Sequence, residues 1–367
     1  MRVMFKHRTW TKSLCMAIGM LFAAINSQAS TLVDKEKNVI DSLFEKTKPQ
    51  CIGRYIIDVP DSFNNNLMNM IFIDDFKIES RPSYRPAFNQ RLSHREQELH
   101  DAIKKPGNDL ENAPFIKEII QLPNNIGVIF DHNESATADI YRQLEAHVYI
   151  GQVEFIIITD IRDFSDPKHR MRKNIFLSRG FSEADSNNKP QKLTMMKSLI
   201  SRLSGRDDED IPRDKGLCIP RGFIKDDETK HVQKVSFTYE SDELTFGVKV
   251  DSSRTASSDT LMSRSPQINE AIALSSLHTI KNGELNSGGI AIQQWLTSGR
   301  QESNRFKGHL PLYDFILYGN ESTASPATPW IYMGLDNTDK KTQYSESQMV
   351  DIWDRLVSSL RYRPGAF

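Results

Sequence analysis

Two short cysteine phrases, CIGRYIIDVP from Cys51 and CIPRGFIKDD from Cys218, place the strongest constraint on the fold of this chain. Each phrase opens a stretch of strand-like sequence that ends on an amphipathic helix, and these helices finish at Leu203 and Leu360. The cysteines and the helix ends are separated by similar lengths of chain, and LISRLSGR resembles LVSSLRYRPG. This order predicts an α+β fold of two related domains, each a mainly antiparallel sheet with packed helices. Chance similarity between two amphipathic helices is the alternative.

The boundary between the two halves is a polar, charged segment, SGRDDEDIPRDKG, with the Gly and Pro residues typical of a linker. We therefore expect an N-terminal domain over residues 30–206 and a linker over residues 207–216. The C-terminal domain then covers residues 217–367.

Two helices carry clear start signals. Arg91–Lys105 is predicted to be helical, with a capping box formed by Ser93 and Glu96. Ser345–Leu360 is the most regular element, because Ser345 and Gln348 form a second capping box and the apolar residues fall on one stripe. Alternating apolar residues in KVSFTYES and LTFGVKVD predict a hairpin between these helices.

The first 29 residues have the features of a secretory signal peptide. A basic start, MRVMFKHRTWTK, precedes the short apolar run SLCMAIGMLFAAI, and the small residues of NSQAS place cleavage between Ala29 and Ser30. The apolar run is shorter than a membrane-spanning helix requires, which argues against the alternative of an uncleaved anchor. The sequence therefore predicts an exported protein without stable membrane insertion.

Two cysteines remain once Cys15 leaves with the signal peptide. An even number of cysteines in an exported chain permits one disulfide, here between Cys51 and Cys218. The alternative is that both are small buried residues at the starts of strands.

The charge of the chain argues against binding to polyanions. Its formal net charge is -1, and loss of Arg2, Lys6, Arg8 and Lys12 with the signal peptide makes the mature chain more acidic. Proteins that bind nucleic acid or anionic membranes usually carry a basic patch. We therefore expect no nucleic-acid partner.

Motifs for catalysis are missing from the sequence. It contains no GxSxG, no P-loop, no strand-linked GxGxxG and no CxxC. His94 and Glu98 share a helix face, but such a pair is usually solvated, and no cofactor or metal is expected. An exported chain of this kind favours binding over catalysis. A periplasmic hydrolase with an unrecognised site and a general envelope adaptor are the alternatives.

Four segments resemble one known family, the immunity proteins against type VI secretion lipases. CIGRYIIDVP resembles the opening of the family, and KGLCIPRGFI resembles the start of its C-terminal domain. The tail SESQMVDIWDRLVSSLRYRPGAF is similar to the closing helix of the family, and RLSHREQELHDAIKK to its first-domain helix. The chain departs from the family pattern at Pro220-Arg221 and in the polar character of SHREQELHD.

The resemblance implies a function that residue spacing does not show. Members of this family lie in the periplasm and bind a phospholipase effector, one to one, so that its active site or lid cannot engage lipid. The implied fold is two α+β domains that grip the effector between or across them. The resemblance thus implies a non-enzymatic protein that protects the cell from its own and its siblings' toxin.

Tight protein binding needs exposed aromatic and Arg anchors. The candidates on loop-like segments are Tyr84 and Arg85 in RPSYRPAF, together with Arg300, Arg305 and Phe306 in SGRQESNRFKG. The alternative for each of them is a solvated loop side chain.

Overall fold

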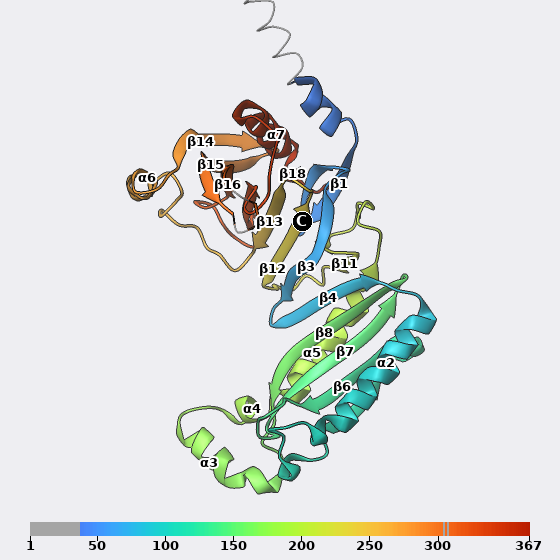
Figure 1. Ribbon diagram of the computed structural model, residues 1–367. Helices are drawn as coiled ribbons and strands as arrows, with labels where there is room; N and C mark the ends of the chain where they lie inside the picture. Colours follow the sequence, from blue (N-terminus) through green and yellow to red (C-terminus); the bar gives the residue numbers. More distant parts are fainter. Residues whose placement is uncertain (1–36, 304, 307) are drawn as a thin grey trace, which may run out of the picture.

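The computed structural model describes residues 37–303, 305–306 and 308–367 of the chain (Figure 1). Residues 37–43 are helical. The named helices that follow are α2 (Arg85–His100), η1 (Asp101–Lys104), η2 (Leu110–Asn112), η3 (Pro123–Asn125), η4 (Pro167–His169), α3 (Arg170–Ser178), α4 (Glu183–Ser186), α5 (Lys189–Arg202), α6 (Ser265–Ala273) and α7 (Glu346–Ser359).

The strands form one large sheet and two small ones. The large sheet has twelve strands in the order β14-β15-β16-β17-β13-β12-β3-β4-β8-β7-β6-β5, and all of its pairs are antiparallel. Its strands are β3 (Asn64–Ile73), β4 (Phe76–Pro82), β5 (Ile116–Gln121), β6 (Gly127–Asn133), β7 (Tyr141–Ile150), β8 (Val153–Arg162), β12 (Gln233–Glu240), β13 (Thr245–Asp251), β14 (His278–Ser287), β15 (Ile290–Glu302), β16 (His309–Gly319) and β17 (Trp330–Asp336).

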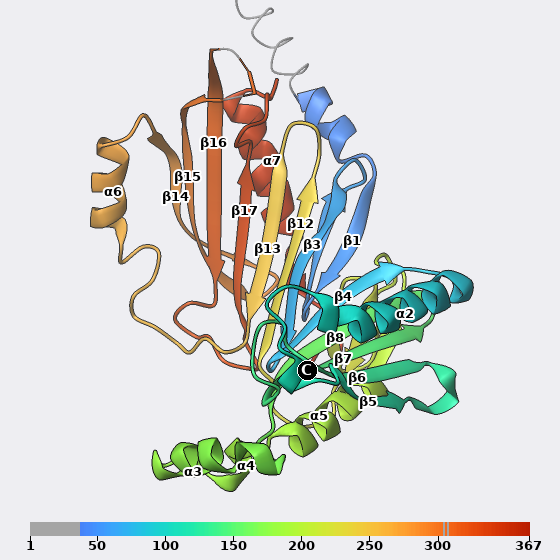
Figure 2. The same ribbon diagram turned by 60° about the horizontal axis from the view of Figure 1, so that its bottom comes forward.

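The large sheet joins the two halves of the sequence at β3 and β12. These strands pair from Gln233 opposite Ile73 to Glu240 opposite Asn64, with a bulge between Ser236 and Thr238. Figure 2 shows that the strands on the two sides of the β3–β4 connection run in different directions, so the sheet bends there. One continuous backbone ladder therefore links both halves.

The two small sheets add further links. One contains β1 (Thr47–Ile52), β2 (Tyr55–Pro60) and β18 (Arg361–Tyr362), so the last strand of the chain pairs with one of the first. The other contains β9 (Leu203–Gly205), β10 (Gly216–Ile219) and β11 (Gly222–Lys225). A backbone bridge between Gly53 and Cys218 connects the two small sheets.

The cysteine phrases meet at this junction. Cys51 and Cys218 are bonded as a disulfide and are both buried. Arg54 makes a two-pronged ion pair with Asp226, at 2.9 and 3.0 Å, and its carbonyl accepts the backbone N–H of Arg363. Burial lowers the pKa of Arg363 to about 10, and its guanidinium donates to the carbonyls of Pro212 and Gly216. The polar segment at residues 207–216 runs from the end of β9 to the first residue of β10, and its carbonyls at Pro212 and Gly216 hold it against the same junction.

The hydrophobic core is continuous through both halves. One cluster contains apolar residues from α5, from α7 and from the strands they cover, among them Met196, Phe155, Phe237 and Trp353. The expected α+β architecture of antiparallel sheets with packed helices is thus confirmed. The closing helix is also confirmed, because Ser345 caps α7 through a capping box with Gln348.

The first long helix begins earlier than predicted. α2 starts at Arg85, where Tyr84 is an extended N-cap and Pro86 occupies the first turn. A proline fits the first turn because the N–H it lacks has no helical partner there. Ser93 and Glu96 consequently lie inside the helix, and the predicted capping box at these residues is wrong.

Buried ion pairs attach α2 to the sheet face opposite α5. Arg95 donates to both carboxylate oxygens of Glu145 at 2.8 and 2.7 Å, and Arg91 pairs with Glu154. Burial alone raises the pKa of Glu145, but hydrogen bonds from His132, His147 and Arg95 outweigh it and hold that pKa well below its ordinary range. Since both glutamates are ionised and almost fully buried, α2 is fixed by charges that cannot be left unpaired.

Candidate functional site

The first pair of predicted anchors lies where β4 turns into α2. Tyr84 is 66% exposed, and its side chain makes no capping hydrogen bond to α2, so it is free to contact a partner. Arg85 is partly committed, because it donates to the carbonyl of Asn125 at 3.0 Å and its guanidinium lies 4.5 Å from the ring centre of Tyr149. Of this pair, Tyr84 is the more available contact.

The second set of predicted anchors lies at the end of the β15–β16 hairpin. Arg305 and Phe306 are in the connecting loop, with the guanidinium 5.7 Å from the ring centre. Arg300, in contrast, is not in a loop, because it belongs to β15 and pairs with Pro311. The ladder extends to Glu302, so the predicted loop is shorter than the sequence indicates. Both views place this hairpin end far from the β4–α2 connection, so the two sets form no single patch (Figures 1 and 2).

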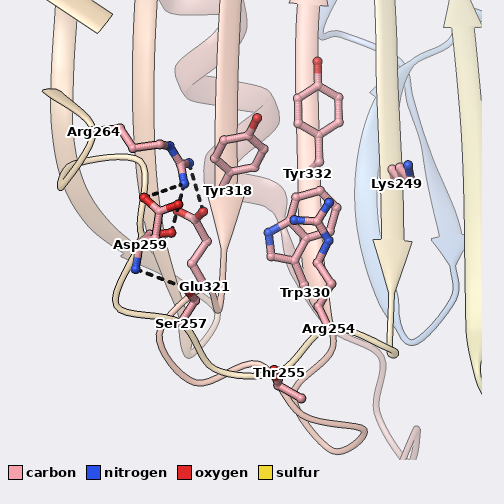
Figure 3. A pocket seen from close by; sticks show the side chains of 10 residues that line it. All are labelled: Lys249, Arg254, Thr255, Ser257, Asp259, Arg264, Tyr318, Glu321, Trp330 and Tyr332. Atoms are coloured by element: carbon pink, nitrogen blue, oxygen red, sulfur yellow. Dashed lines mark hydrogen bonds and ion pairs between the residues drawn. The ribbon is translucent and has the colours of Figure 1, made fainter. Parts of the chain in front are cut away.

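A hollow of about 570 Å³, missed by the sequence analysis, opens on the sheet near the other end of β16 (Figure 3). Its floor is an aromatic group formed by Tyr318, Trp330 and Tyr332, with neighbouring ring centres 5.4 to 6.4 Å apart. The loop that precedes α6 forms one wall. Tyr318 lies seven residues along β16 from Pro311, the strand partner of Arg300. This separation is roughly 23 Å at about 3.3 Å per residue. The hollow is therefore separate from the hairpin end.

Charged residues line both sides of the hollow. On one side, Arg264 pairs with Glu321 at 3.2 Å and with Asp259 at 3.5 Å. On the other side, the guanidinium of Arg254 lies 3.7 Å from the ring centre of Trp330, and Lys249 projects from β13 (Figure 3). The acidic residues are thus held by Arg264, whereas Arg254 rests on an aromatic face.

The hydroxyl of Tyr332, at the edge of the aromatic floor, is neutral at physiological pH. Burial, with the nearby Asp314 and Tyr318, raises the pKa of Tyr332 to about 12, so its hydroxyl keeps its proton. The ring lies along its own strand over Gly334, where an added Cβ would come within 2.3 Å of the hydroxyl oxygen. Glycine at this position therefore leaves room for the tyrosine that forms the floor.

The hollow belongs to a wider open face of the sheet. Tyr318, Tyr332, Lys249, Ser236 and Met70 are successive cross-strand partners, and such partners share one face. Figure 2 shows α7 behind these strands, on the other face. The row ends at Met70, which is 56% exposed.

A second hollow lies where the sheet bends, at the end of this row. Its volume is about 490 Å³, and Met70, Phe72, Ile156 and Pro220 give it an apolar lining. Arg81 and the buried Glu154, which pair at 2.6 Å, close one side. The open face thus offers an aromatic, basic hollow and an apolar hollow connected by one row of side chains.

One cluster has the order of a catalytic relay but not its function. The Thr229 hydroxyl lies 2.8 Å from Nε2 of His231, whose Nδ1 lies 2.8 Å from Asp74. Asp227, however, accepts the Thr229 hydroxyl at 2.7 Å and also lies 3.0 Å from the same His231 nitrogen. The threonine proton is therefore directed to a carboxylate, and the cluster fixes the loop around Thr229 to the β3–β4 turn.

His94 and Glu98 pair at 3.2 Å on the exposed surface of α2. Within residues 37–303, 305–306 and 308–367, no group of three or more His, Cys, Asp or Glu side chains could hold a metal ion. The same residues contain no helix long and apolar enough to cross a membrane. The predicted cleavage position, Ala29 and Ser30, lies outside the described residues.

Comparison with known proteins gives two family matches in sequence order. The model of the Tle cognate immunity protein 4 N-terminal domain matches residues 48–206, and that of the C-terminal domain matches residues 210–365. Together they span nearly all of the described chain.

Solved structures share the fold at low sequence identity. An apo structure of the immunity protein TplEi of the T6SS from Pseudomonas aeruginosa is 17% identical, with a TM-score of 0.66 over 87% of this chain and 97% of that one. A chain of the Tle4-Tli4 complex is also 17% identical, with a TM-score of 0.65 over 87% and 98%. TplEi complexed with a peptide called "L" gives 16% identity and a TM-score of 0.61 over 87% and 98%. A search of curated proteins finds no match.

Proposed function

Because this chain belongs to the Tle cognate immunity protein 4 family, we propose that it is a periplasmic immunity protein that binds and neutralises a type VI secretion lipase effector. The observation that carries this proposal is the match of both family domains, in order, over residues 48–206 and 210–365. The Tle4-Tli4 complex adds support, since a chain of the same fold occurs there together with a protein partner.

The proposed mechanism is occupancy of the effector. An inhibitor of this kind blocks the active site or holds the lid, and it needs no chemistry of its own. Nanomolar affinity corresponds to about 12 kcal/mol and usually to roughly 1,600 Å² of buried surface. The open face, with its two hollows of about 570 and 490 Å³, supplies concave surface with aromatic and Arg residues of the kind that dominate such interfaces.

The proposed location is the periplasm. The predicted signal peptide supports export, and the bonded pair Cys51–Cys218 is consistent with an oxidising compartment. Tyr84, Arg85, Arg300, Arg305 and Phe306 remain proposed contacts, in two separate groups. A one-to-one complex that engages the open face and either group would wrap around the effector.

The test uses tagged residues 30–367 exported to the periplasm of the native host. Proteins captured on the tag are identified by mass spectrometry, and the main partner is purified, titrated by calorimetry and assayed for phospholipase activity. We expect one lipase, bound one to one at nanomolar affinity and inactive in the complex. Several weak partners would favour an envelope adaptor, and ester hydrolysis by the purified chain alone would favour the hydrolase alternative.

A further inference from the structure

The aromatic hollow contains a buried donor without an acceptor. Trp330 is 4% exposed, and its indole Nε1 has no hydrogen-bond partner among the described residues. Figure 3 shows this nitrogen on the side of the ring that faces Tyr318 and Glu321. Leaving a buried N–H unpaired is unfavourable, and an arriving acceptor removes that penalty. The hollow is thus short of an acceptor in the free protein.

The cations beside Trp330 are also largely unneutralised. Arg254 has one carboxylate near it, that of Asp251 at 3.8 Å. This carboxylate already accepts hydrogen bonds from the backbone N–H and the hydroxyl of Ser253. The side chain of Lys249 makes no hydrogen bond or ion pair within the part of the chain that the structure describes. The other acidic residues, Glu321 and Asp259, are held by Arg264. The hollow therefore presents two cations and one N–H donor to an incoming group.

We propose that this hollow receives an acidic side chain from a surface loop of the lipase effector. Its carboxylate pairs with Arg254 and Lys249, and a carbonyl oxygen of the same loop accepts the N–H of Trp330, while apolar neighbours of that side chain pack on Tyr318 and Tyr332. The proposal rests on the function proposed above and adds the chemistry of the contact.

Entry of the carboxylate requires only a local movement. The side chain of Arg254 is 50% exposed and covers the face of Trp330, and exposed side chains change rotamer within nanoseconds. When Arg254 turns toward the ligand, the indole edge opens while the cation stays beside it. Paired with an anion on an aromatic surface, the guanidinium gains a charge-assisted hydrogen bond that the free protein lacks.

The chemistry of an anionic lipid headgroup is similar, but the charge of the whole chain favours a protein ligand. The chain has a formal net charge of -1, including the basic signal peptide, so an anionic membrane repels the mature protein. A loop from a soluble effector does not meet this barrier.

The test compares two variants with the same change of charge. Arg254→Gln with Lys249→Gln removes the cations of the hollow, and Arg179→Gln with Lys341→Gln removes two exposed cations elsewhere. With the purified effector, calorimetry is expected to show at least about tenfold weaker binding for the first variant and no change for the second. Trp330→Phe, which keeps an aromatic ring but loses the N–H, is expected to weaken binding as well.

Carbodiimide cross-linking identifies the ligand group directly. This reagent joins amines to carboxylates in contact, so Lys249 is expected to link to an Asp or Glu of the effector in the wild-type complex. Unchanged affinity of the Arg254/Lys249 variant, together with no such link, would overturn the proposal while leaving the proposed function intact. Sedimentation with phosphatidylglycerol vesicles that depends on Arg254 would instead assign the hollow to lipid. A wild-type chain that binds no lipase would remove the proposed function itself.

Discussion

The disulfide between Cys51 and Cys218 is expected to contribute a large share of the stability of this protein. It joins positions 167 residues apart, so its loss releases a very long loop in the unfolded chain. The loop-entropy relation gives about 5 kcal/mol for this length, while measured disulfides more often contribute about 2–4 kcal/mol. A total stability of roughly 5–15 kcal/mol is usual for a domain, so removal of this bond is a severe perturbation.

The assay is urea unfolding of residues 30–367 in which both cysteines are replaced by alanine. We expect the free energy of unfolding to fall by at least about 2 kcal/mol relative to the oxidised protein. Both cysteines are buried beside Phe223, so alanine also leaves a small cavity. Reduced wild-type protein is the control, because it keeps both sulfurs and loses only the bond. If reduction lowered the stability by less than about 1 kcal/mol, the loop argument would be refuted.

Three further predictions concern single positions. Asp139 accepts hydrogen bonds from Lys168, His169 and Lys117, which outweigh its burial and lower its pKa to about 2, so Asp139→Asn should cost about 2 kcal/mol at pH 7 in urea unfolding. This lowered pKa stabilises the folded protein above the unfolded value near 3.8, and the stabilisation is lost as the pH falls. The difference in free energy of unfolding between wild type and Asp139→Asn should therefore narrow by about 1 kcal/mol between pH 5 and pH 3. Gly127→Ala should cost about 3 kcal/mol or more in the same assay, since its Cβ would lie 1.9 Å from the carbonyl oxygen of His147 in β7. Replacing Arg305 and Phe306 with alanine should weaken effector binding about tenfold in calorimetry, if both act as anchors.

Each of these predictions has a matched control. Glu134→Gln changes an exposed carboxylate in the same region, and an equal pH response of both variants would contradict the assignment to Asp139. Gly247→Ala is on the open sheet face with nothing within 4 Å of the added Cβ, so it should be nearly neutral. Unchanged effector affinity of the Arg305/Phe306 variant would remove the hairpin end from the interface.

Local signals in the sequence were sufficient for the elements whose partners are close along the chain. The capping box at Ser345 and the apolar stripe behind it predicted α7 to within one residue at each end. The hairpin of β12 and β13 follows from alternation of apolar residues, since its strands are joined by a short turn. In both cases the pattern that determines the element lies inside the element itself.

Long-range pairing and surface shape had no such signal. Nothing in the sequence of β3 specifies β12 as its neighbour, because alternation fixes which face is buried and not which strand lies alongside. Trp330, Tyr332 and Tyr318 alternate with core residues and are visible as strand residues, yet the hollow arises only when β16 and β17 pair. Lys249 comes from a third strand, β13, and Arg254 from the loop that follows it, so their approach to Trp330 is a product of the fold.

The position of β1, β2 and β3 shows that the two halves of the sequence depend on each other. The family models divide the chain near residue 206, but β3 fills the edge of β12 and β2 pairs with β18 at the end of the chain. A fragment that begins at residue 210 therefore lacks the neighbour of β12 and exposes an unpaired edge. Pairing of residues 47–73 with strands far along the chain also fixes the angle between the two parts of the sheet. Since binding energy is not spent on ordering two loose domains, a surface fixed in this way suits the tight binding to one partner that the proposed function requires.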